Sequence, residues 1–373
     1  MKIGVVCYPT FGGSGVIATE LGIELSKKNH EVHFITYSQP VRLEALSPKL
    51  HFHEVNVPDY PLFKYEPYEL ALSSKLFDVI SKHKIEILHV HYAIPHAYAA
   101  FMAKKMLNDN DIDIPIITTL HGTDITLVGN HPFYKPAVTF SINNSDYVTC
   151  VSKSLKQDTR DFFGIERDIE VIPNFIDIEK YHKKHNLCER NMIAKGDEKI
   201  IVHVSNFRPL KRIIDVIKIF EKISLKVNSK LIMVGDGPEK KKAKDYLRKN
   251  NLKNKVLFLG ETYQVDEILC SSDLFLLPSE KESFGLSALE AMALKVPVIS
   301  TNIGGLKDLV INDESGYTFN IGDIDGMASK AIEILSNENL LSNYKNQAYE
   351  NAKKYDIKKI IPIYEDLYFK ALG

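Results

Sequence analysis

The sequence predicts an α/β protein made of two doubly wound parallel-sheet domains that face each other across a cleft. The chain has 373 residues, which exceeds the size at which a single hydrophobic core stops growing. Short β-branched runs alternate with longer amphipathic stretches, which is the pattern of a parallel sheet with helices on both faces. The pattern restarts near the middle of the chain, so each half predicts a sheet of its own.

The first series of elements predicts a domain over residues 1–171. We expect strands at residues 2–7, 31–36, 85–91, 115–120 and 146–151. Amphipathic stretches between them predict helices, for instance at 14–28 and 68–82. We expect this domain to bind the acceptor of the reaction considered below.

The second series predicts a domain over residues 172–355, entered through a hinge near 171–177. We expect its strands at 199–204, 230–234, 255–259, 273–277, 297–300 and 317–319. Residues 356–373 follow as an amphipathic helix, which we expect to pack back towards the first domain. Sheets of this kind bind ligands at the carboxyl ends of their strands, so the cleft is the expected small-molecule site.

Composition excludes several classes of protein. Lys and Arg number 47 against 48 Asp and Glu, so the net charge of -1 offers no global attraction for nucleic acid or an anionic membrane. Four scattered cysteines predict reduced thiols in a cytoplasmic protein rather than a disulfide framework or zinc site. No apolar run approaches the roughly 20 residues that span a bilayer, so we expect no stable membrane association. The oligomeric state stays open.

The amino-terminal loop, PTFGGSG, follows the first strand and opens a helix, so its N–H groups can hold an anion. Gly13, Gly15 and Ala18 also fit the spacing of a dinucleotide-binding motif. The second strand, however, is followed by Tyr37 and Ser38, where a ribose-binding acid should stand. The sequence therefore favours an anion-binding loop over a nicotinamide site, with a plain tight turn as the other alternative.

Histidines and paired acids raise the question of a metal site. His89 and His91 share one face of a strand, yet no acid or cysteine joins them at ligand spacing, and His89 is expected in the core. The Asp-x-Asp pairs at 109–113 and 323–325 fit solvated loops, and the lysine clusters at 240–242, 353–354 and 358–359 fit the wet sides of helices. We therefore predict no metal ligands. His121 follows a strand at the cleft edge, so we expect it to touch ligand.

Two cations and two acids follow strands of the second domain. Arg208 and Lys211 come directly after the strand 199–204, where paired cations suit a diphosphate. Glu282 follows the strand 273–277, and Glu290 lies in the helix expected at 286–294, beyond a Phe-Gly bend. Glu290 could accept two ribose hydroxyls, and Glu282 the hydroxyls of a sugar. Together these residues predict a nucleotide-sugar pocket.

These residues resemble family 4 of the retaining glycosyltransferases, which have the GT-B fold of two facing Rossmann-like domains. The resemblance covers nearly the whole chain. In the second half it includes the E-x7-E motif at Glu282 and Glu290, VGDGP at 234–238, FLG at 258–260, and the glycine-containing pairs at 304–305 and 316–317. The first half resembles those members of the family that transfer GlcNAc from UDP-GlcNAc to the hydroxyl of L-malate, the first step of bacillithiol biosynthesis. The segments that carry this resemblance are CYPTFGGSGVIATELG, HFHEV, HVHYAIPHA and TTLHGTDIT, followed by HVSNFRPLKR.

The resemblance implies a role for each donor-site residue. Glu290 would bind the ribose, and Glu282 would bind GlcNAc hydroxyls together with the Phe284 and Gly285 amides. Arg208 and Lys211 would stabilise the departing UDP. The other expected donor contacts are Gly12 and Gly13 at the phosphates, His121 near the sugar 6-hydroxyl, and Asn206, which stands where many relatives place the phosphate-binding arginine.

The acceptor residues and the mechanism follow in the same way. Ser14, Tyr92, Thr119 and Thr123 would line the malate site. We expect His121, Arg208, Lys211 and Glu282 to take part in catalysis, without a metal ion or other cofactor, by a front-face route. The alternatives are a family 4 enzyme with a polysaccharide or lipid acceptor, and a non-catalytic nucleotide-sugar sensor.

Overall fold

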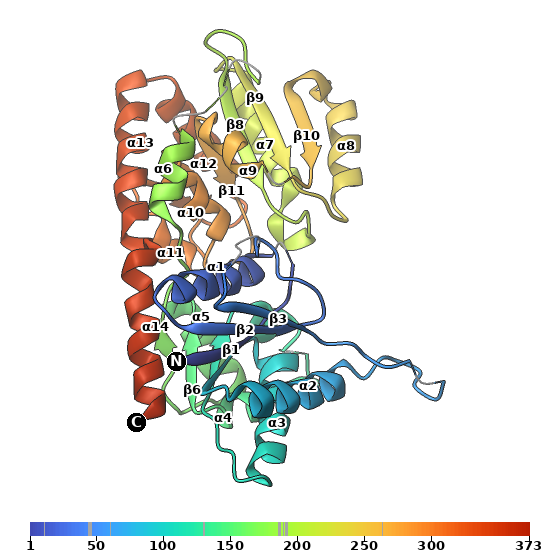
Figure 1. Ribbon diagram of the computed structural model, residues 1–373. Coiled ribbons are helices and arrows are strands. Elements are labelled where there is room, and N and C mark those ends of the chain that lie inside the picture. Colours follow the sequence, from blue (N-terminus) through green and yellow to red (C-terminus); the bar gives the residue numbers. More distant parts are fainter. Residues whose placement is uncertain are drawn as a thin grey trace. The chain divides into compact units, whose positions relative to one another are not determined.

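The chain divides into two compact units, each built on its own sheet (Figure 1). The first unit is Met1–Asn174 together with Lys358–Gly373, and the second is Phe175–Ile357. The computed structural model describes residues 1–10, 12–43, 47–59, 61–129, 131–185, 188, 190, 193–262 and 264–373.

The first unit contains a seven-stranded parallel sheet in the order β3-β2-β1-β4-β5-β6-β7. Its strands are β1 (Lys2–Val6), β2 (Glu31–Thr36), β3 (Leu50–Glu54), β4 (Ile87–His91), β5 (Ile116–Leu120), β6 (Tyr147–Cys150) and β7 (Glu170–Val171). Its helices are α1 (Gly13–Lys27), α2 (Tyr68–His83), α3 (Tyr98–Asn108), α4 (Lys135–Asn143), α5 (Lys153–Phe163) and the carboxyl-terminal α14 (Ile357–Leu372), and π-helical turns occupy Ala93–Ala97 and Thr123–Leu127. β1 and β4 are buried along almost their whole length, as expected for central strands of a sheet covered on both faces.

The second unit contains a six-stranded parallel sheet in the order β10-β9-β8-β11-β12-β13. Its strands are β8 (Lys199–Val204), β9 (Ser229–Val234), β10 (Val256–Gly260), β11 (Leu274–Leu277), β12 (Val298–Thr301) and β13 (Gly316–Phe319). Its helices are α6 (Ile178–His185), α7 (Ile213–Ser224), α8 (Lys240–Lys249), α9 (Val265–Cys270), α10 (Leu286–Ala293), α11 (Leu306–Leu309), α12 (Ile324–Leu335) and α13 (Glu338–Ala352). Apolar residues of α7 and α12 pack against β8, β9 and β11 in one continuous core.

The predicted fold class is confirmed, and so is every predicted strand, each within two residues of an end. Two strands were not predicted. β3 lies at the edge of the first sheet and carries His51 and His53 where a core strand would carry β-branched residues. β7 has only two residues, which is too short for any sequence period to appear.

The prediction of four reduced thiols is wrong for two of them. Cys188 and Cys270 form a disulfide, with Cα atoms 5.8 Å apart and a sequence separation of 82. That Cα separation is normal for a bridged pair, and sequence spacing alone could not reveal it. Cys7 and Cys150 are free and buried.

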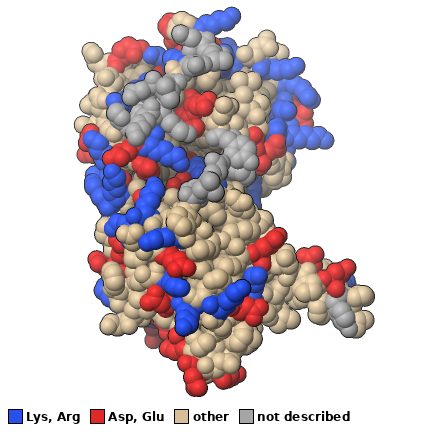
Figure 2. All heavy atoms as spheres, in the orientation of Figure 1, with Lys and Arg blue, Asp and Glu red and all other residues tan. Residues whose placement is uncertain are grey.

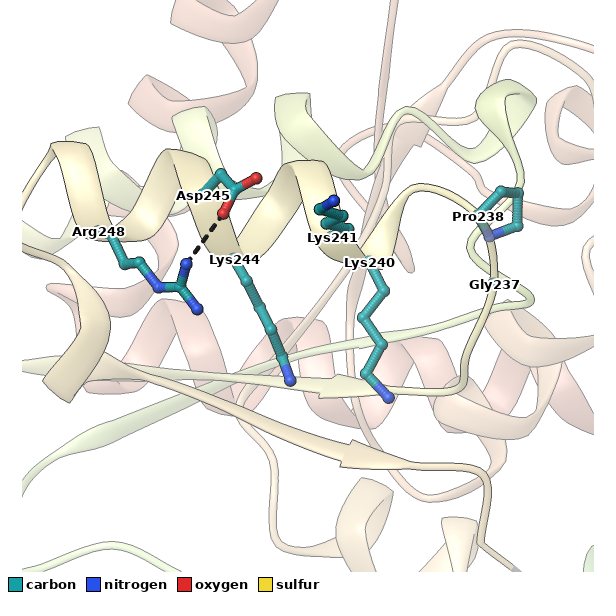
Figure 3. Close-up of a pocket in the computed structure, with 7 residues that line it drawn as sticks. All are labelled: Gly237, Pro238, Lys240, Lys241, Lys244, Asp245 and Arg248. Carbon is teal, nitrogen blue, oxygen red and sulfur yellow. Dashed lines mark hydrogen bonds and ion pairs between the residues drawn. The ribbon is translucent and has the colours of Figure 1, made fainter.

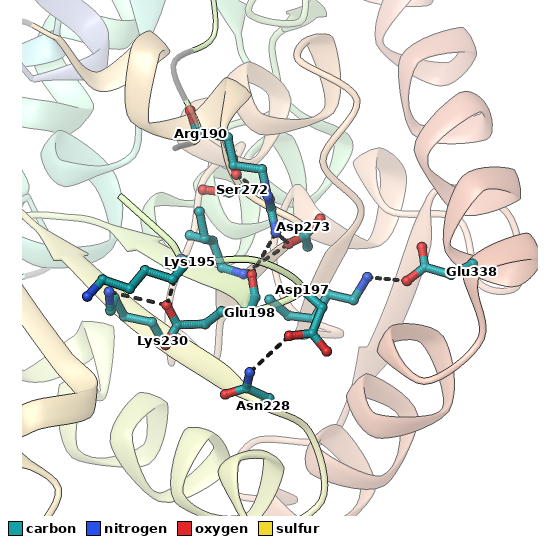
Figure 4. Close-up of polar contacts among 12 residues, drawn as sticks. Arg190, Lys195, Asp197, Glu198, Asn228, Lys230, Ser272, Asp273 and Glu338 are labelled. Carbon is teal, nitrogen blue, oxygen red and sulfur yellow. Dashed lines mark hydrogen bonds and ion pairs between the residues drawn. The ribbon is translucent and has the colours of Figure 1, made fainter. Parts of the chain in front are cut away.

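A buried carboxylate ties the start of β8 to its surroundings in the second unit (Figure 4). Asp273 accepts hydrogen bonds from the Ile200 N–H at 2.9 Å, from Arg190 at 2.7 Å and from Lys345 at 2.8 Å. Burial would raise the pKa of Asp273, but Lys345, the Ile200 amide and Arg190 overcome this and hold the pKa below its usual value. The network fixes the amino end of the strand whose other end carries the predicted cations.

Helix α14 belongs to the first unit through both polar and apolar contacts. The Tyr368 hydroxyl lies 2.7 Å from His89 Nδ1, and Glu365 forms ion pairs with Lys28 and His30. Tyr364 and Tyr368 are almost fully buried. Among the described residues, no helix combines the length and the apolar composition needed to cross a membrane.

Candidate active site

The predicted cations lie on the loop that joins β8 to α7. Asn206 and Arg208 are exposed, and Lys211 is half-buried in a short helical turn, Pro209–Lys211. The Lys211 ammonium forms an ion pair with Glu282 Oε1. One of the two predicted cations is therefore in direct contact with one of the two predicted acids. The two side chains are only 17% and 11% exposed, so this pair is more shielded from water than a surface ion pair. Seventy-one residues separate them in the sequence, and the motif gave no sign of this contact.

Glu282 is fixed by its own loop and by the turn that follows β12. The Ser279 hydroxyl donates to Glu282 Oε1 at 2.9 Å, and the Gly305 N–H donates to the Glu282 carbonyl at 3.1 Å. A Cβ atom on Gly304, whose φ is +52°, would stand 1.7 Å from that carbonyl oxygen. The glycine pair at 304–305 therefore allows the backbone to pack against the Glu282 loop, which explains why the sequence carries two glycines there.

The bend before α10 turns the chain towards Glu290. Gly285 has φ +95°, a conformation that glycine adopts without strain, and begins the helix that carries Glu290. Phe284 is buried with its ring edge-on to Tyr355, so it anchors the bend rather than facing solvent. The Tyr181 hydroxyl donates to Glu290 Oε1 at 2.9 Å. Tyr181, on α6, is a site residue that sequence reasoning missed, because it lies 109 residues from Glu290.

The start of α1 carries the predicted residues of the amino-terminal loop. Gly12 and Gly13 are exposed at the helix N-terminus, and the Ser14 hydroxyl lies 2.9 Å from the Tyr92 hydroxyl. Gly15 is the position at which the loop cannot accept a side chain, since a Cβ atom there would meet the Thr10 carbonyl at 2.4 Å and the Tyr8 carbonyl at 2.5 Å. The structure thus brings Ser14 and Tyr92 together at the N-terminus of α1, which has no side-chain cap at Gly12.

His121 lies at the end of a row of stacked imidazoles that begins with His89 in the core. His121 Nε2 is 2.8 Å from His91 Nδ1, and the His89 and His91 rings stack with centroids 4.5 Å apart. Burial, and to a smaller extent repulsion from the neighbouring His96, lower the pKa of His121 to about 3. His121 is therefore neutral at pH 7, which suits a hydrogen-bonding partner for a hydroxyl and excludes a permanent positive charge.

Asp124 holds the two loops of this region in place and was not predicted as a site residue. Its carboxylate accepts from the Ala93 N–H at 3.0 Å and from the Gly122 N–H at 2.8 Å, and the His121 N–H is 3.2 Å away. Burial raises the pKa of Asp124 more than the backbone N–H bonds lower it, and the resulting pKa is about 6. The position of His121 thus depends on a buried acid that follows it by three residues.

The two predicted threonines lie in different environments. Thr123 is half-buried in the turn after His121. Thr119 is fully buried, and its hydroxyl lies 2.7 Å both from His89 Nε2 and from the Thr149 hydroxyl. The structure therefore groups Thr123 with His121 at the strand end, whereas the Thr119 hydroxyl is engaged in the core.

A basic pocket of about 380 Å³ is lined by Gly237, Pro238 and α8 (Figure 3), and Gly237 packs against the backbone of Phe207, the residue before Arg208. Lys240, Lys244 and Arg248 point to the same side of the helix there, and the basic side chains gather over α8 in Figure 2. Arg248 pairs with Asp245 and Lys240 with Asp236 on the helix surface. These contacts are those of a solvated helix face.

Two family models match the chain. Residues 11–180 match the model described as Glycosyltransferase Family 4, and residues 189–354 match Glycosyl transferases group 1. The N-acetyl-alpha-D-glucosaminyl L-malate synthase of Bacillus anthracis is 44% identical over 374 residues, with 100% of this chain and 97% of the relative covered. An uncharacterized glycosyltransferase of Methanocaldococcus jannaschii is 28% identical, with 97% of both chains covered.

Solved structures agree with the fold. Anabaena HepE, solved in complex with UDP and glucose, has a TM-score of 0.81 at 19% identity, with 98% of this chain and 99% of that chain covered. Sucrose-phosphate synthase from Thermosynechococcus elongatus has a TM-score of 0.79 at 18% identity, with 99% and 98% covered. From the two family models and the full-length relative, the chain belongs to glycosyltransferase family 4 and is a glycosyltransferase with the GT-B fold.

Proposed function

We propose that this enzyme transfers GlcNAc from UDP-GlcNAc to the hydroxyl of L-malate with retention at the anomeric carbon. The observation that carries the proposal is the 44% identity, over the full length of this chain, to a protein named N-acetyl-alpha-D-glucosaminyl L-malate synthase. The polar groups of the two units supply a chemically suitable residue for each part of the two substrates.

The donor would be held by the second unit. Glu290 accepts hydroxyls of the uridine ribose with the carboxylate that Tyr181 already orients. Glu282 accepts hydroxyls of the GlcNAc ring, and the free N–H groups at the start of α10 lie in the same loop. Lys211 then faces the diphosphate, together with Arg208 and Asn206 from the exposed part of the loop.

The acceptor would be held by the first unit. L-Malate carries two carboxylates, so its site needs hydrogen-bond donors and little competing negative charge. The hydroxyls of Ser14 and Tyr92 and the N-terminus of α1 meet this need. Thr123 and the neutral His121 supply further hydrogen-bonding groups of the same unit.

The reaction breaks the bond between the anomeric carbon and the diphosphate oxygen and forms a bond to the malate hydroxyl oxygen. In the front-face route, the hydroxyl proton passes to the departing phosphate oxygen, which leaves GlcNAc-malate and UDP as products. Negative charge grows on the diphosphate in the transition state, and the fixed cations of the 206–211 loop stabilise it without a metal ion.

The test is incubation of the purified enzyme with UDP-GlcNAc and a panel of small hydroxy acids, with UDP release and product mass as readouts. We expect malate to be the best acceptor, the product to have an α linkage, and EDTA to leave kcat unchanged. UDP release only with a polysaccharide or lipid acceptor would favour the alternative family 4 function. A loss of activity in EDTA that Mg²⁺ restores would refute the metal-independent mechanism.

A further inference from the structure

A cluster of four histidines and one glutamate lies at the β2–β3 edge of the first sheet. Figure 1 shows the two strands side by side, and their register pairs His33 with His51 and Ile35 with His53. Glu31 and His33 share one face of β2, and His51 and His53 share the same face of β3, because side chains two residues apart point the same way. His83, from the last turn of α2, completes the cluster.

The distances within the cluster are those of a ligand set. Glu31 Oε1 lies 3.1 Å from His33 Nε2 and 3.3 Å from His51 Nε2. The ligand atoms of these three side chains all lie within 4.8 Å of one another. In a tetrahedral zinc site with bonds of about 2.0–2.2 Å, neighbouring ligand atoms are separated by about 3.3–3.6 Å. The two distances to Glu31, 3.1 and 3.3 Å, lie close to the lower end of that range.

A further observation concerns the hydrogen bonding of the His51 ring. Its Nε2 atom is buried and makes no hydrogen bond among the described residues, although Glu31 Oε1 lies 3.3 Å away and the side chain is 36% exposed. Buried ring nitrogens normally make a hydrogen bond, so this nitrogen is available to an ion shared with Glu31 and His33. The partial exposure of the ring gives an ion a path into the site.

The other nitrogen of His33 is held as metal-bound histidines usually are. His33 Nδ1 lies 2.9 Å from His53 Nε2, so with Nε2 on an ion the ring proton on Nδ1 is donated to His53. Three lysines surround the cluster. Lys2 Nζ lies 3.6 Å from Glu31 Oε2, and the charges of Lys75 and Lys82 act on His53 and His83, respectively.

We propose that His33, His51 and Glu31 bind one divalent transition-metal ion of the zinc type, with His53 positioning His33. Two imidazole nitrogens and a carboxylate oxygen suit Zn²⁺ and disfavour Mg²⁺ and Ca²⁺, which prefer oxygen ligands throughout. The ion would join the edge strand β3 to β2 and thereby stabilise the sheet edge. Glu31 is the first residue of β2, whereas substrates of such sheets bind at the carboxyl ends, so the role is structural and independent of the sugar transfer.

The test uses the full chain without a histidine tag, stripped with EDTA, dialysed and titrated with Zn²⁺ by calorimetry. We expect one ion per chain and a rise in Tm of about 5–10 °C at a hundredfold excess over the Kd. Co²⁺ in place of Zn²⁺ should give the visible absorption of a low-coordinate nitrogen–oxygen site. Chelation should leave kcat within twofold, as the metal-independent mechanism also requires, so Zn²⁺ binding and Tm are the readouts that test this proposal on its own.

Variants identify the ligands. His51→Gln and Glu31→Gln should each weaken Zn²⁺ binding at least tenfold, and His53→Leu about 10–100-fold because it removes the partner of His33. His83→Gln and the exposed His131→Gln serve as controls, and each should change the Kd less than threefold. The absence of saturable binding, or binding that survives His51→Gln and Glu31→Gln, would overturn the proposal. So would a loss in His83→Gln alone, since the ion would then lie in the group formed by His33, His53 and His83.

Discussion

Replacing Lys211 by Ala should lower kcat by about 100–1,000-fold. Lys211 is 17% exposed, so its charge acts on the leaving diphosphate through a medium of low effective dielectric constant. Two unit charges about 4 Å apart interact by about 4 kcal/mol at an effective dielectric constant of 20. This agrees with the loss of about 2.7–4 kcal/mol when one fixed donor to a developing negative charge is removed. Each 1.4 kcal/mol corresponds to a factor of about ten in rate.

The assay is UDP release under saturating UDP-GlcNAc and L-malate, with Tm measured on the same preparations. Lys241→Ala is the matched control, because it removes an exposed lysine of α8, outside the 206–211 loop, and should leave kcat within twofold. The ion pair with Glu282 offers a second check. If Lys211 acted only by holding Glu282 in place, Lys211→Ala with Glu282→Gln would be no slower than Glu282→Gln alone.

Wild-type kcat in Lys211→Ala with an unchanged Tm would exclude Lys211 from the stabilisation of the leaving diphosphate. A fall in Tm with an unchanged kcat would assign Lys211 a structural role through its pair with Glu282 and would remove it from the mechanism. We expect the reverse, namely a large fall in kcat and a small change in Tm, because a half-buried ion pair contributes little net stability once its own desolvation is counted.

Three further predictions concern stability and the support of the site. Asp273→Ala should lower the free energy of unfolding by about 1–3 kcal/mol in urea denaturation, because the buried Ile200 N–H and the partly exposed Arg190 and Lys345 lose their acceptor; an unchanged free energy of unfolding would contradict this. Gly304→Ala should raise the KM for UDP-GlcNAc and lower Tm, because the added Cβ atom would collide with the Glu282 carbonyl. Gly260→Ala is the control, since Gly260 also has a positive φ but no atom within 4 Å of an added Cβ; it should cost only about 1–2 kcal/mol of backbone strain and leave the KM unchanged. His89 and His121 have pKa values of about 3 in the folded chain and about 6.5 in the unfolded chain, so between these values only the unfolded chain binds the two protons. The free energy of unfolding should therefore be at its full value above pH 6.5 and fall below it by about 1.4 kcal/mol per pH unit for each histidine. A constant free energy of unfolding from pH 7 to 5 would contradict this prediction.

The fold could be predicted because parallel sheets leave a strong local signal. Strands buried on both faces appear as continuous apolar runs, such as KIIVHV, which the structure assigns to β8 without any difference at its ends. The edge strand β3 has no such run, because its histidine-bearing face is half-exposed. The same alternation that hid β3 from prediction is what aligns His51 and His53 on one face.

The residues of the site could be predicted, but most of their contacts could not. Residues that directly follow a strand lie at its carboxyl end. This is enough to group Arg208 with Lys211 after β8 and to place Glu282 after β11, the neighbouring strand of the same sheet. The contacts of Glu290 with Tyr181 and of His121 with His91 join residues far apart in the sequence, so no local pattern encodes them. Long-range pairs of this kind depend on packing, and only the structure supplies them.

The ion pair between Lys211 and Glu282 implies that the two ends of the donor are recognised in a coupled way. A diphosphate carries more negative charge than one carboxylate, so UDP should draw Lys211 away from Glu282, which keeps its bond from Ser279 and becomes free to accept sugar hydroxyls. UDP itself lacks the sugar and therefore pays for breaking the pair without using the freed carboxylate. Glu282→Gln removes that cost, so it should bind UDP about 3–10-fold more tightly in calorimetry while lowering kcat with UDP-GlcNAc. Ser279→Ala, which leaves the ion pair in place, is the control and should not tighten UDP binding. Weaker UDP binding in Glu282→Gln would mean that the lysine does not exchange its partner, and that the acid supports the phosphate site rather than competing with it.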